Sequence, residues 1–304
     1  MNILRILGDA ALVGVFFHSD GDGVCSAAML LKALREAGRK YTLACGEYGD
    51  HFEKFYEKRG EVNFFLDIAV PSPDAVSGFP KPVIVDHHPV SVKDWKGVVY
   101  VNPRLEDPKA YISTSQVLFD LLGKPDLRWL MRLGAVSDRA LEPEGREAEG
   151  AEIIEAVRFF EKETGLVKLA KFLSRCSGLQ DLLDSGFSET ASRFRSELRE
   201  EIRRFEIYMK DVTFFETEKK NMTSILASRL LDLYPDKTII VYARSDGFYK
   251  ISGRSRKHNM GLIFSEAAKG IGTGGGHENA AGAKIPAGEL SRFRKRVERL
   301  LSSR

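Results

Sequence analysis

The sequence predicts an α/β protein of two domains: an N-terminal domain built on a parallel sheet and a smaller C-terminal α/β domain, joined by a connector helix. Three observations support this. With 304 residues, the chain exceeds the roughly 250 at which one hydrophobic core usually stops growing. Short apolar runs alternate with segments of helical spacing in the first part, which is typical of a parallel sheet covered on both faces. A long amphipathic segment then precedes a second, shorter α/β pattern.

The first domain is expected over residues 1–187. A continuous apolar run at Leu12–Phe17 predicts a strand, and apolar residues at helical spacing from Val24 then complete a βα unit that ends at Gly38. Four further apolar runs predict strands at Tyr41–Cys45, Val62–Leu66, Val83–Val85 and Val98–Val101. The spacing is helical from Pro125 to about Gly186, and antiparallel alternation is absent from this domain.

Residues 188–210 predict one amphipathic connector helix. Its apolar positions recur at steps of three or four: Phe194, Leu198, Ile202, Phe205 and Met209. The second domain is expected over residues 211–304. Its predicted elements are strand Val212–Phe215, helix Thr223–Leu233, strands Thr238–Ala243 and Phe248–Ser252, and a helix over Gly261–Ala268. A glycine loop and a basic amphipathic helix that contains Arg292 and Leu301 follow.

Composition excludes several classes of protein. Hydrophobic residues at 43% and charged residues at 29% exclude a disordered chain. The net charge is only +3, so an anionic ligand has to be met by a local basic patch. Because no apolar run approaches the roughly 18 residues of a membrane span and no signal-peptide pattern is present, we expect a cytoplasmic protein with no membrane partner. Cys25, Cys45 and Cys176 are unpatterned, which argues against a disulfide framework and a thiolate zinc site.

Side chains that can bind metals follow three of the predicted early strands, at the point where each strand ends. In chain order they are His18, Asp20, Asp22, Asp67, Asp86, His87 and His88. The carboxyl ends of parallel strands face one crevice, so we expect these side chains to converge there, with Asp138 as a further acid. Carboxylates and imidazoles without thiolates suit Mn²⁺ or Mg²⁺, and the number of acids favours two cations.

Each of these pieces also has an ordinary structural interpretation. An acid after a strand is usually a turn or helix-cap residue, which applies to Asp67 and Asp138 taken singly, and the Asp-Gly-Asp-Gly run at 20–23 can equally be a turn. The three adjacent ionisable groups at 86–88 are different. Burying three such groups directly after a strand carries a desolvation cost that a purely structural role rarely justifies. Their presence together with the first run favours a metal site.

The motifs HSDGDG, FLDIAVP, VDHHP and AVSD, in that order, resemble the four motifs of the DHH phosphoesterase superfamily, and ISGRS and GTGGGHENAAGA resemble its companion C-terminal domain, DHHA1. The resemblance covers nearly the whole chain and, in length and motif style, is strongest to compact archaeal RecJ-like nucleases. It implies two Mn²⁺ ions per chain, with Mg²⁺ as an alternative. The implied metal ligands are His18, Asp20, Asp22, Asp67, His87 and Asp138, with Asp67 bridging the two ions and Asp20 and Asp22 each holding one.

The resemblance also implies catalytic groups and substrate contacts. Asp86 and His88 would support the ligands or face the substrate, and His277 would stabilise charge on the phosphate. The implied substrate-binding residues are Arg254, Ser255, Gly274, Gly275, Gly276 and Asn279. A glycine run permits positive φ and close backbone approach to a phosphate, although glycines in a row are usually a flexible turn. In the family pattern the first histidine lies four positions before the first acid, a place that Phe16 occupies here, so His18 departs from it.

We therefore expect a metal-dependent phosphodiesterase that acts as an exonuclease on single-stranded DNA or RNA or on short oligonucleotides by metal-activated water, with its active site in the cleft between the domains. One alternative is a phosphoesterase for small substrates such as nanoRNA, phosphoadenosine phosphate or a cyclic dinucleotide. A second alternative is a non-catalytic replication or repair scaffold, because the superfamily includes a helicase cofactor whose metal ligands have decayed. Expected partners are single-stranded nucleic acid and replication or repair proteins such as a helicase.

Overall fold

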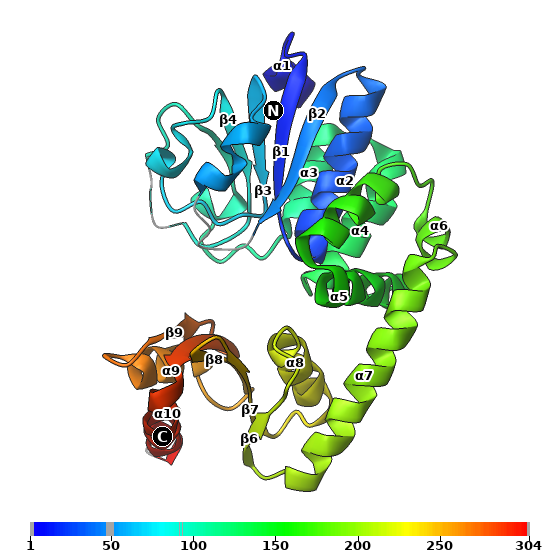
Figure 1. Cartoon of the computed structure of the whole chain (residues 1–304). Coiled ribbons are helices and arrows are strands. Elements are labelled where there is room, and N and C mark those ends of the chain that lie inside the picture. Colours follow the sequence, from blue (N-terminus) through cyan, green and yellow to red (C-terminus); the bar gives the residue numbers. More distant parts are fainter. Residues whose placement is uncertain (1–2, 47–51, 91, 93, 303–304) are drawn as a thin grey trace. The chain divides into compact units, whose positions relative to one another are not determined.

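The computed structural model describes residues 3–46, 52–90, 92 and 94–302. It divides the chain into two compact units, Met1–Ser192 and Arg193–Arg304, each with a five-stranded sheet of its own (Figure 1). The boundary falls inside helix α7 (Phe187–Tyr208), which forms where the connector helix is predicted. The predicted fold class is confirmed.

The sheet of the first unit is entirely parallel, as predicted, with the strand order β2-β1-β3-β4-β5. Its strands are β1 (Leu12–His18), β2 (Lys40–Gly46), β3 (Val62–Leu66), β4 (Pro82–Val85) and β5 (Val99–Val101). One face carries an aromatic cluster in which the Phe16 ring lies 4.8 Å from that of Phe55 and 5.1 Å from that of Phe65. Phe16 is therefore a core residue, and no ligand role is available at that position.

Helix α2 (Gly21–Glu36) is fully buried along most of its length because it packs against β1 and three other helices. The helices of this unit are α1 (Ile3–Leu7), α2, α3 (Thr114–Leu122), α4 (Arg128–Ser137), α5 (Glu147–Leu173) and α6 (Leu179–Leu183) (Figure 1). The predicted helical stretch after Pro125 is thus three helices, and α5 is interrupted at Lys162, whose φ is 54°. Helix α3 was not predicted from the sequence.

The second unit has a mixed sheet, in the order β6-β7-β8-β10-β9, in which only β6 and β7 run parallel. Its strands are β6 (Val212–Glu216), β7 (Thr238–Ser245), β8 (Phe248–Arg254), β9 (Thr273–Gly276) and β10 (Ala280–Pro286), and its further helices are α8 (Thr223–Leu233), α9 (Met260–Ala268) and α10 (Leu290–Ser302). The expected glycine loop is wrong: the glycines form β9, an edge strand paired with β10. The basic terminal helix is α10, which buries Phe293 against Phe264.

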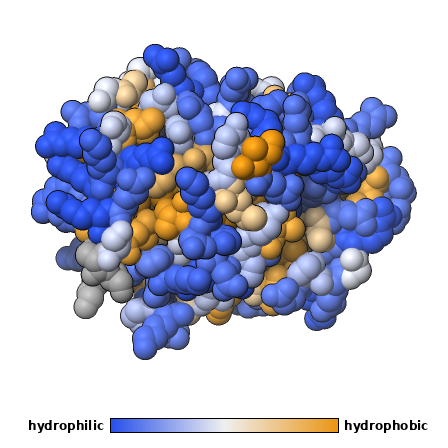
Figure 2. Space-filling model, turned by 90° about the horizontal axis from the view of Figure 1, so that it is seen from below, coloured by the Kyte–Doolittle hydropathy of each residue, from blue (hydrophilic) through white to orange (hydrophobic). Residues whose placement is uncertain are grey.

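The surface seen from below is largely hydrophilic, with apolar patches between the polar side chains (Figure 2). Among the helices of the described residues, none combines the length and the apolar character needed to cross a bilayer.

Candidate metal centre

The candidate centre lies where β1, β3 and β4 end. Asp67 directly follows β3 and has a φ of 62°, a left-handed conformation that aspartate adopts more readily than most residues. Its backbone N–H donates to the Val85 carbonyl oxygen at 2.9 Å, and the N–H of Asp86 donates to that of Val101 at 3.0 Å. The sheet ladder therefore continues one residue beyond each strand and holds these two acids at its carboxyl edge.

The Asp-Gly-Asp-Gly run is the start of a helix rather than a turn. Asp20 caps α2, and its Oδ1 accepts a hydrogen bond from the Gly23 N–H at 3.0 Å. A Cβ atom at position 23 would lie 2.3 Å from the carbonyl oxygen of His18, so only glycine fits there. This close approach brings Asp22, in the first turn of α2, to the buried edge of β1.

All six predicted ligands lie in overlapping groups whose ligand atoms are within 4.8 Å of one another. One group contains His18, Asp20 and Asp67, a second contains Asp22, His87 and Asp138, and a third contains Asp67, His87 and His88. The two oxygens of Asp67 face different partners: Oδ2 lies 3.7 Å from His18 Nδ1, and Oδ1 lies 3.4 Å from His87 Nε2. Asp67 is therefore placed between the first two groups, which is the arrangement a bridging carboxylate needs.

Burial makes these charges costly in the absence of a cation. It raises the pKa of Asp67 well above its ordinary value, that of Asp22 to about 6 and that of Asp138 to about 8, with the neighbouring acids adding to each shift. For Asp20, burial acts in the same direction, but the adjacent His18 outweighs it and holds the pKa below the ordinary value. Burial lowers the pKa of His87 to about 4, so its imidazole is neutral near pH 7 and free of the proton that would block a metal.

Two buried atoms of the second group have no hydrogen-bond partner among the described residues: His87 Nδ1 and Asp138 Oδ2, which lie 3.7 Å apart. Buried polar atoms are nearly always paired, so an arrangement of this kind fits an ion that both atoms contact. The groups contain four acids and three imidazoles and no thiolate, a donor set that suits Mn²⁺ or Mg²⁺. The residues present thus fit a divalent cation.

Helix α3 supplies a part of the site that the sequence analysis missed. Its first two backbone N–H groups, at Thr114 and Ser115, donate to the two oxygens of Asp22 at 2.7 and 2.9 Å. The Thr114 hydroxyl donates to Asp67 Oδ1 at 2.9 Å. The signal for this helix is the capping box formed by Ser113 and Gln116, which is visible in the sequence.

His88 belongs to a separate hydrogen-bonded chain beside the ligands. Its Nδ1 lies 2.7 Å from Oδ1 of the buried Asp86, and the Tyr100 hydroxyl contacts the other oxygen of that carboxylate at 3.5 Å. Asn102 in turn donates to the Tyr100 hydroxyl at 2.8 Å and to the His88 carbonyl oxygen at 2.9 Å. These contacts fix the orientation of the half-buried His88 ring, as a carboxylate does for an imidazole that takes part in chemistry.

The predicted residues of the second unit lie at the ends of β8 and β9. Arg254 donates to the hydroxyls of Ser228 and Ser224 at 3.0 and 2.8 Å. His277 and Asn279 are exposed in the turn between β9 and β10. Ser255, in contrast, has no exposed surface, and its hydroxyl is 3.0 Å from that of Thr238, so in this structure it supports the end of β8, and its predicted substrate contact stays a prediction.

The register of β9 on β10 determines which N–H groups of the glycines face away from the sheet. His277 and Ala280 exchange both backbone hydrogen bonds, at 2.8 and 3.3 Å. Along an antiparallel ladder, residue pairs that exchange hydrogen bonds alternate with pairs that do not. The N–H groups of Gly274 and Gly276 therefore point away from β10, toward an edge with which no other described strand pairs. These two amides therefore take no part in the β9–β10 ladder.

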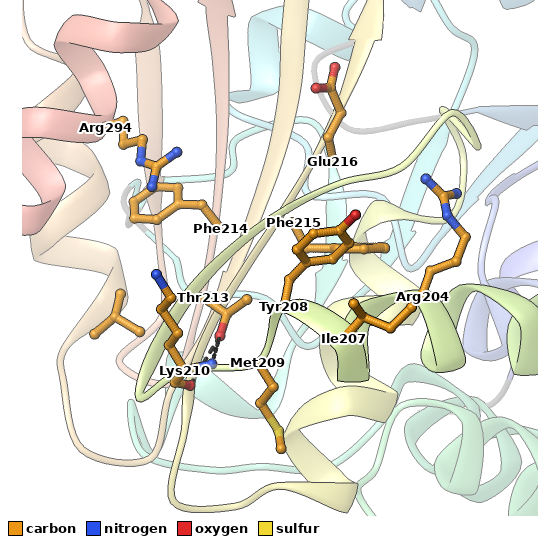
Figure 3. Close-up of a pocket in the computed structure, with 11 residues that line it drawn as sticks. Arg204, Ile207, Tyr208, Met209, Lys210, Thr213, Phe214, Phe215, Glu216 and Arg294 are labelled. Carbon is orange, nitrogen blue, oxygen red and sulfur yellow. Dashed lines mark hydrogen bonds between the residues drawn. The ribbon is translucent and has the colours of Figure 1, made fainter.

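A pocket of about 520 Å³ elsewhere in the second unit contains none of the predicted site residues. It lies between the end of α7, β6 and α10, with the Arg294 guanidinium 4.8 Å from the centre of the Phe214 ring (Figure 3). The residues that line this pocket therefore lie far from the metal ligands in the sequence.

Two family models match the chain. Residues 12–140 match the N-terminal domain of the DHH family, and residues 211–303 match the DHHA1 domain. An uncharacterized protein of Methanocaldococcus jannaschii is 31% identical over 99 residues, which are 31% of this chain and 22% of that protein.

Solved structures of low sequence identity share the fold. RecJ from Thermus thermophilus, in complex with Mn²⁺, has a TM-score of 0.80 at 17% identity over 99% of this chain and 54% of its own. An exonuclease RecJ bound to manganese has a TM-score of 0.63 at 17% identity, over 96% and 90% of the two chains. CDC45 from Entamoeba histolytica has a TM-score of 0.58 at 9% identity, over 95% of each chain. This chain thus spans about half of the Thermus thermophilus RecJ and less than a quarter of the curated relative.

Proposed function

The chain belongs to the DHH/DHHA1 superfamily of phosphoesterases, and on that premise we propose that it is a two-metal phosphodiesterase. In this proposal it removes nucleotides from an end of single-stranded nucleic acid or of short oligonucleotides. One observation carries the proposal: Asp67 lies between two groups of buried ligands, with one carboxylate oxygen toward His18 and the other toward His87. The structural similarity to RecJ and CDC45 does not by itself decide the activity, because one fold can serve several functions.

In this proposal, His18, Asp20 and Asp67 hold the first cation, and Asp22 and His87, with Asp138 and Asp67, hold the second. Two such cations, when bound, would lower the pKa of water and offset the negative charge of a phosphate. Thr114 and the α3 N–H groups keep the Asp67 and Asp22 carboxylates oriented, because each donates to a ligand oxygen.

Other residues of the chain would act on the phosphate directly. Asp86 fixes the Nδ1 side of the His88 ring, and we propose that this ring, when both of its nitrogens carry a proton, donates to a phosphoryl oxygen through Nε2. We propose that Arg254, the N–H groups of Gly274 and Gly276, His277 and Asn279 hold a phosphate of the same substrate. The placement of the substrate between the two units stays a prediction.

The test is digestion of end-labelled DNA and RNA of graded length with Mn²⁺, resolved on a gel, with metal-free protein as the control. We expect single nucleotides to be released in order from one end. Hydrolysis confined to the shortest substrates would instead support the small-substrate phosphoesterase. Titration of metal-free protein with Mn²⁺ in a calorimeter separates both from the scaffold, because an enzyme of this kind binds two ions per chain and a scaffold with decayed ligands binds none.

A further inference from the structure

We propose that the ring of Tyr111 stacks on a nucleobase of the substrate and so makes the enzyme selective for phosphodiesters that carry bases. The inference rests on the proposed function, since it concerns the same site. It assigns a role to a residue that none of the sequence motifs contains.

Tyr111 is fixed at the edge of the second ligand group from two sides. Its hydroxyl donates to the backbone carbonyl oxygen of Asp138 at 2.9 Å. Its ring centre lies 6.3 Å from that of His87, with the two planes at 67°. Even so, 55% of the residue is exposed. A planar apolar surface is thus held open beside two proposed ligands.

An exposed tyrosine alone is ordinary, but the position of this one is not. The segment that joins β5 to α3 contains the exposed apolar residues Leu105, Tyr111 and Ile112, and Val99 of β5 is exposed as well. Arg104 and Arg139 also lie near Tyr111, so cations that can meet a phosphate stand beside the aromatic ring. The open aromatic face adds a surface that suits a nucleobase, because every base has a π-face that can stack, whereas a polyphosphate or a sugar phosphate has no π-face.

The hydroxyl contact offers a competing explanation, in which Tyr111 only positions Asp138. The two are separated by their dependence on the substrate. We would measure kcat/KM with Mn²⁺ for a single-stranded oligonucleotide and for one of equal length made of abasic sites. The variants are Tyr111→Ala, Tyr111→Phe and the matched control Tyr208→Ala, which removes a tyrosine of similar exposure from the second unit.

We expect Tyr111→Ala to lower kcat/KM about fivefold to a hundredfold for the oligonucleotide, the range that base stacking spans, and less than twofold for the abasic substrate. Tyr111→Phe, which keeps the ring, and Tyr208→Ala should leave both values near wild type. An equal loss on the two substrates, or a loss in Tyr111→Phe as large as in Tyr111→Ala, overturns the proposal in favour of the positioning role.

If the wild type hydrolyses neither substrate, the proposed function fails, and binding still decides this inference. Adenosine 5′-monophosphate and ribose 5-phosphate would be titrated into the full chain with Mn²⁺. We expect Tyr111→Ala to weaken binding of the nucleotide alone, and equal effects on the two ligands would contradict the inference.

Discussion

The metal centre of the first unit and the predicted phosphate-binding residues of the second are built in opposite ways. In the first, Asp22 and Asp67 are 1% exposed and their charges are brought together against a desolvation cost. In the second, His277 and Asn279 are exposed, and Arg254 has partners within its own unit, the hydroxyls of Ser224 and Ser228. A bound cation would stabilise the first arrangement, whereas the second has its hydrogen-bond partners within its own unit. Changes in the first should therefore alter metal binding and stability, and changes in the second only kinetics.

The largest effect is expected from Asp67→Asn. Asparagine also tolerates the positive φ, so the fold is kept while the shared ligand is lost, and both metal groups lose a member. We expect hydrolysis to fall more than about 1,000-fold even at saturating Mn²⁺. The matched control is Asp246→Asn, an exposed aspartate that also has a positive φ. Near-wild-type rates for Asp67→Asn would contradict the two-metal assignment.

His277→Ala should come next, because loss of a donor to transition-state charge costs about 10² to 10³ in kcat. Mn²⁺ affinity, measured by calorimetry, should stay unchanged, since His277 is not a proposed ligand. His258→Ala is the control, as a half-buried histidine of the same unit. If His277→Ala lost metal affinity and kept kcat, the contrast between the two regions would be wrong.

Thr114→Val tests the support that α3 gives to the first region. The valine is nearly isosteric but cannot donate to Asp67 Oδ1, so we expect Mn²⁺ affinity to fall about 10- to 100-fold. Thr223→Val makes the same change at a buried threonine of the second unit and should leave metal affinity at the wild-type value. Equal Mn²⁺ affinities in the two variants would contradict the proposed role of Thr114 in supporting the metal ligands.

Between pH 6.5 and 8.5, the stability of the metal-free protein should depend on pH through the acids of the metal centre. A carboxyl whose folded pKa is raised stabilises the fold fully at low pH and loses that contribution as pH rises through the folded value, about 8 for Asp138. His87, whose pKa burial lowers to about 4, changes the stability only below pH 6.5, the ordinary pKa of histidine. Between pH 6.5 and 8.5 we expect the free energy of unfolding to fall by about 2 kcal/mol. Denaturant titrations should show the loss, and Mn²⁺ should reverse it.

The smallest effect is expected from Arg254→Ala, which removes one proposed phosphate contact from a half-buried arginine at the end of β8. KM should rise several-fold with kcat nearly unchanged, and the dependence of KM on salt should become shallower. Arg256→Ala serves as the control for loss of one positive charge. An equal rise of KM in both variants would indicate that Arg254 acts through the general positive electrostatic field and not through a specific contact.

The elements that the sequence predicts best are those decided by burial. Strand β3 and helix α8 begin and end at the predicted residues, because continuous or periodic apolar patterns mark them. The edge strand β9 was missed because three glycines resemble a loop. They form a strand only through pairing with β10 and close packing on α9, where a Cβ at Gly274 would lie 2.6 Å from the Phe264 carbonyl oxygen. That condition is tertiary and leaves no local signal.

The candidate site shows the same division. The convergence of acids and histidines at the carboxyl edge follows from parallel strands and is predictable. The way in which Asp67 faces both ligand groups depends on its left-handed backbone, and the contacts from Thr114 and Ser115 depend on how α3 packs against α2. Neither can be read from spacing, because both arise from the packing of segments far apart in the chain.

The strand order has a consequence for how the protein folds. Because β1 lies between β2 and β3, it cannot complete its hydrogen bonds during synthesis until residues 62–66 have followed. The last proposed ligand, Asp138, comes later still, so the site exists only once most of the unit has assembled. Contacts of such long sequence separation form late, which predicts that Mn²⁺ slows unfolding and hardly changes the rate of folding.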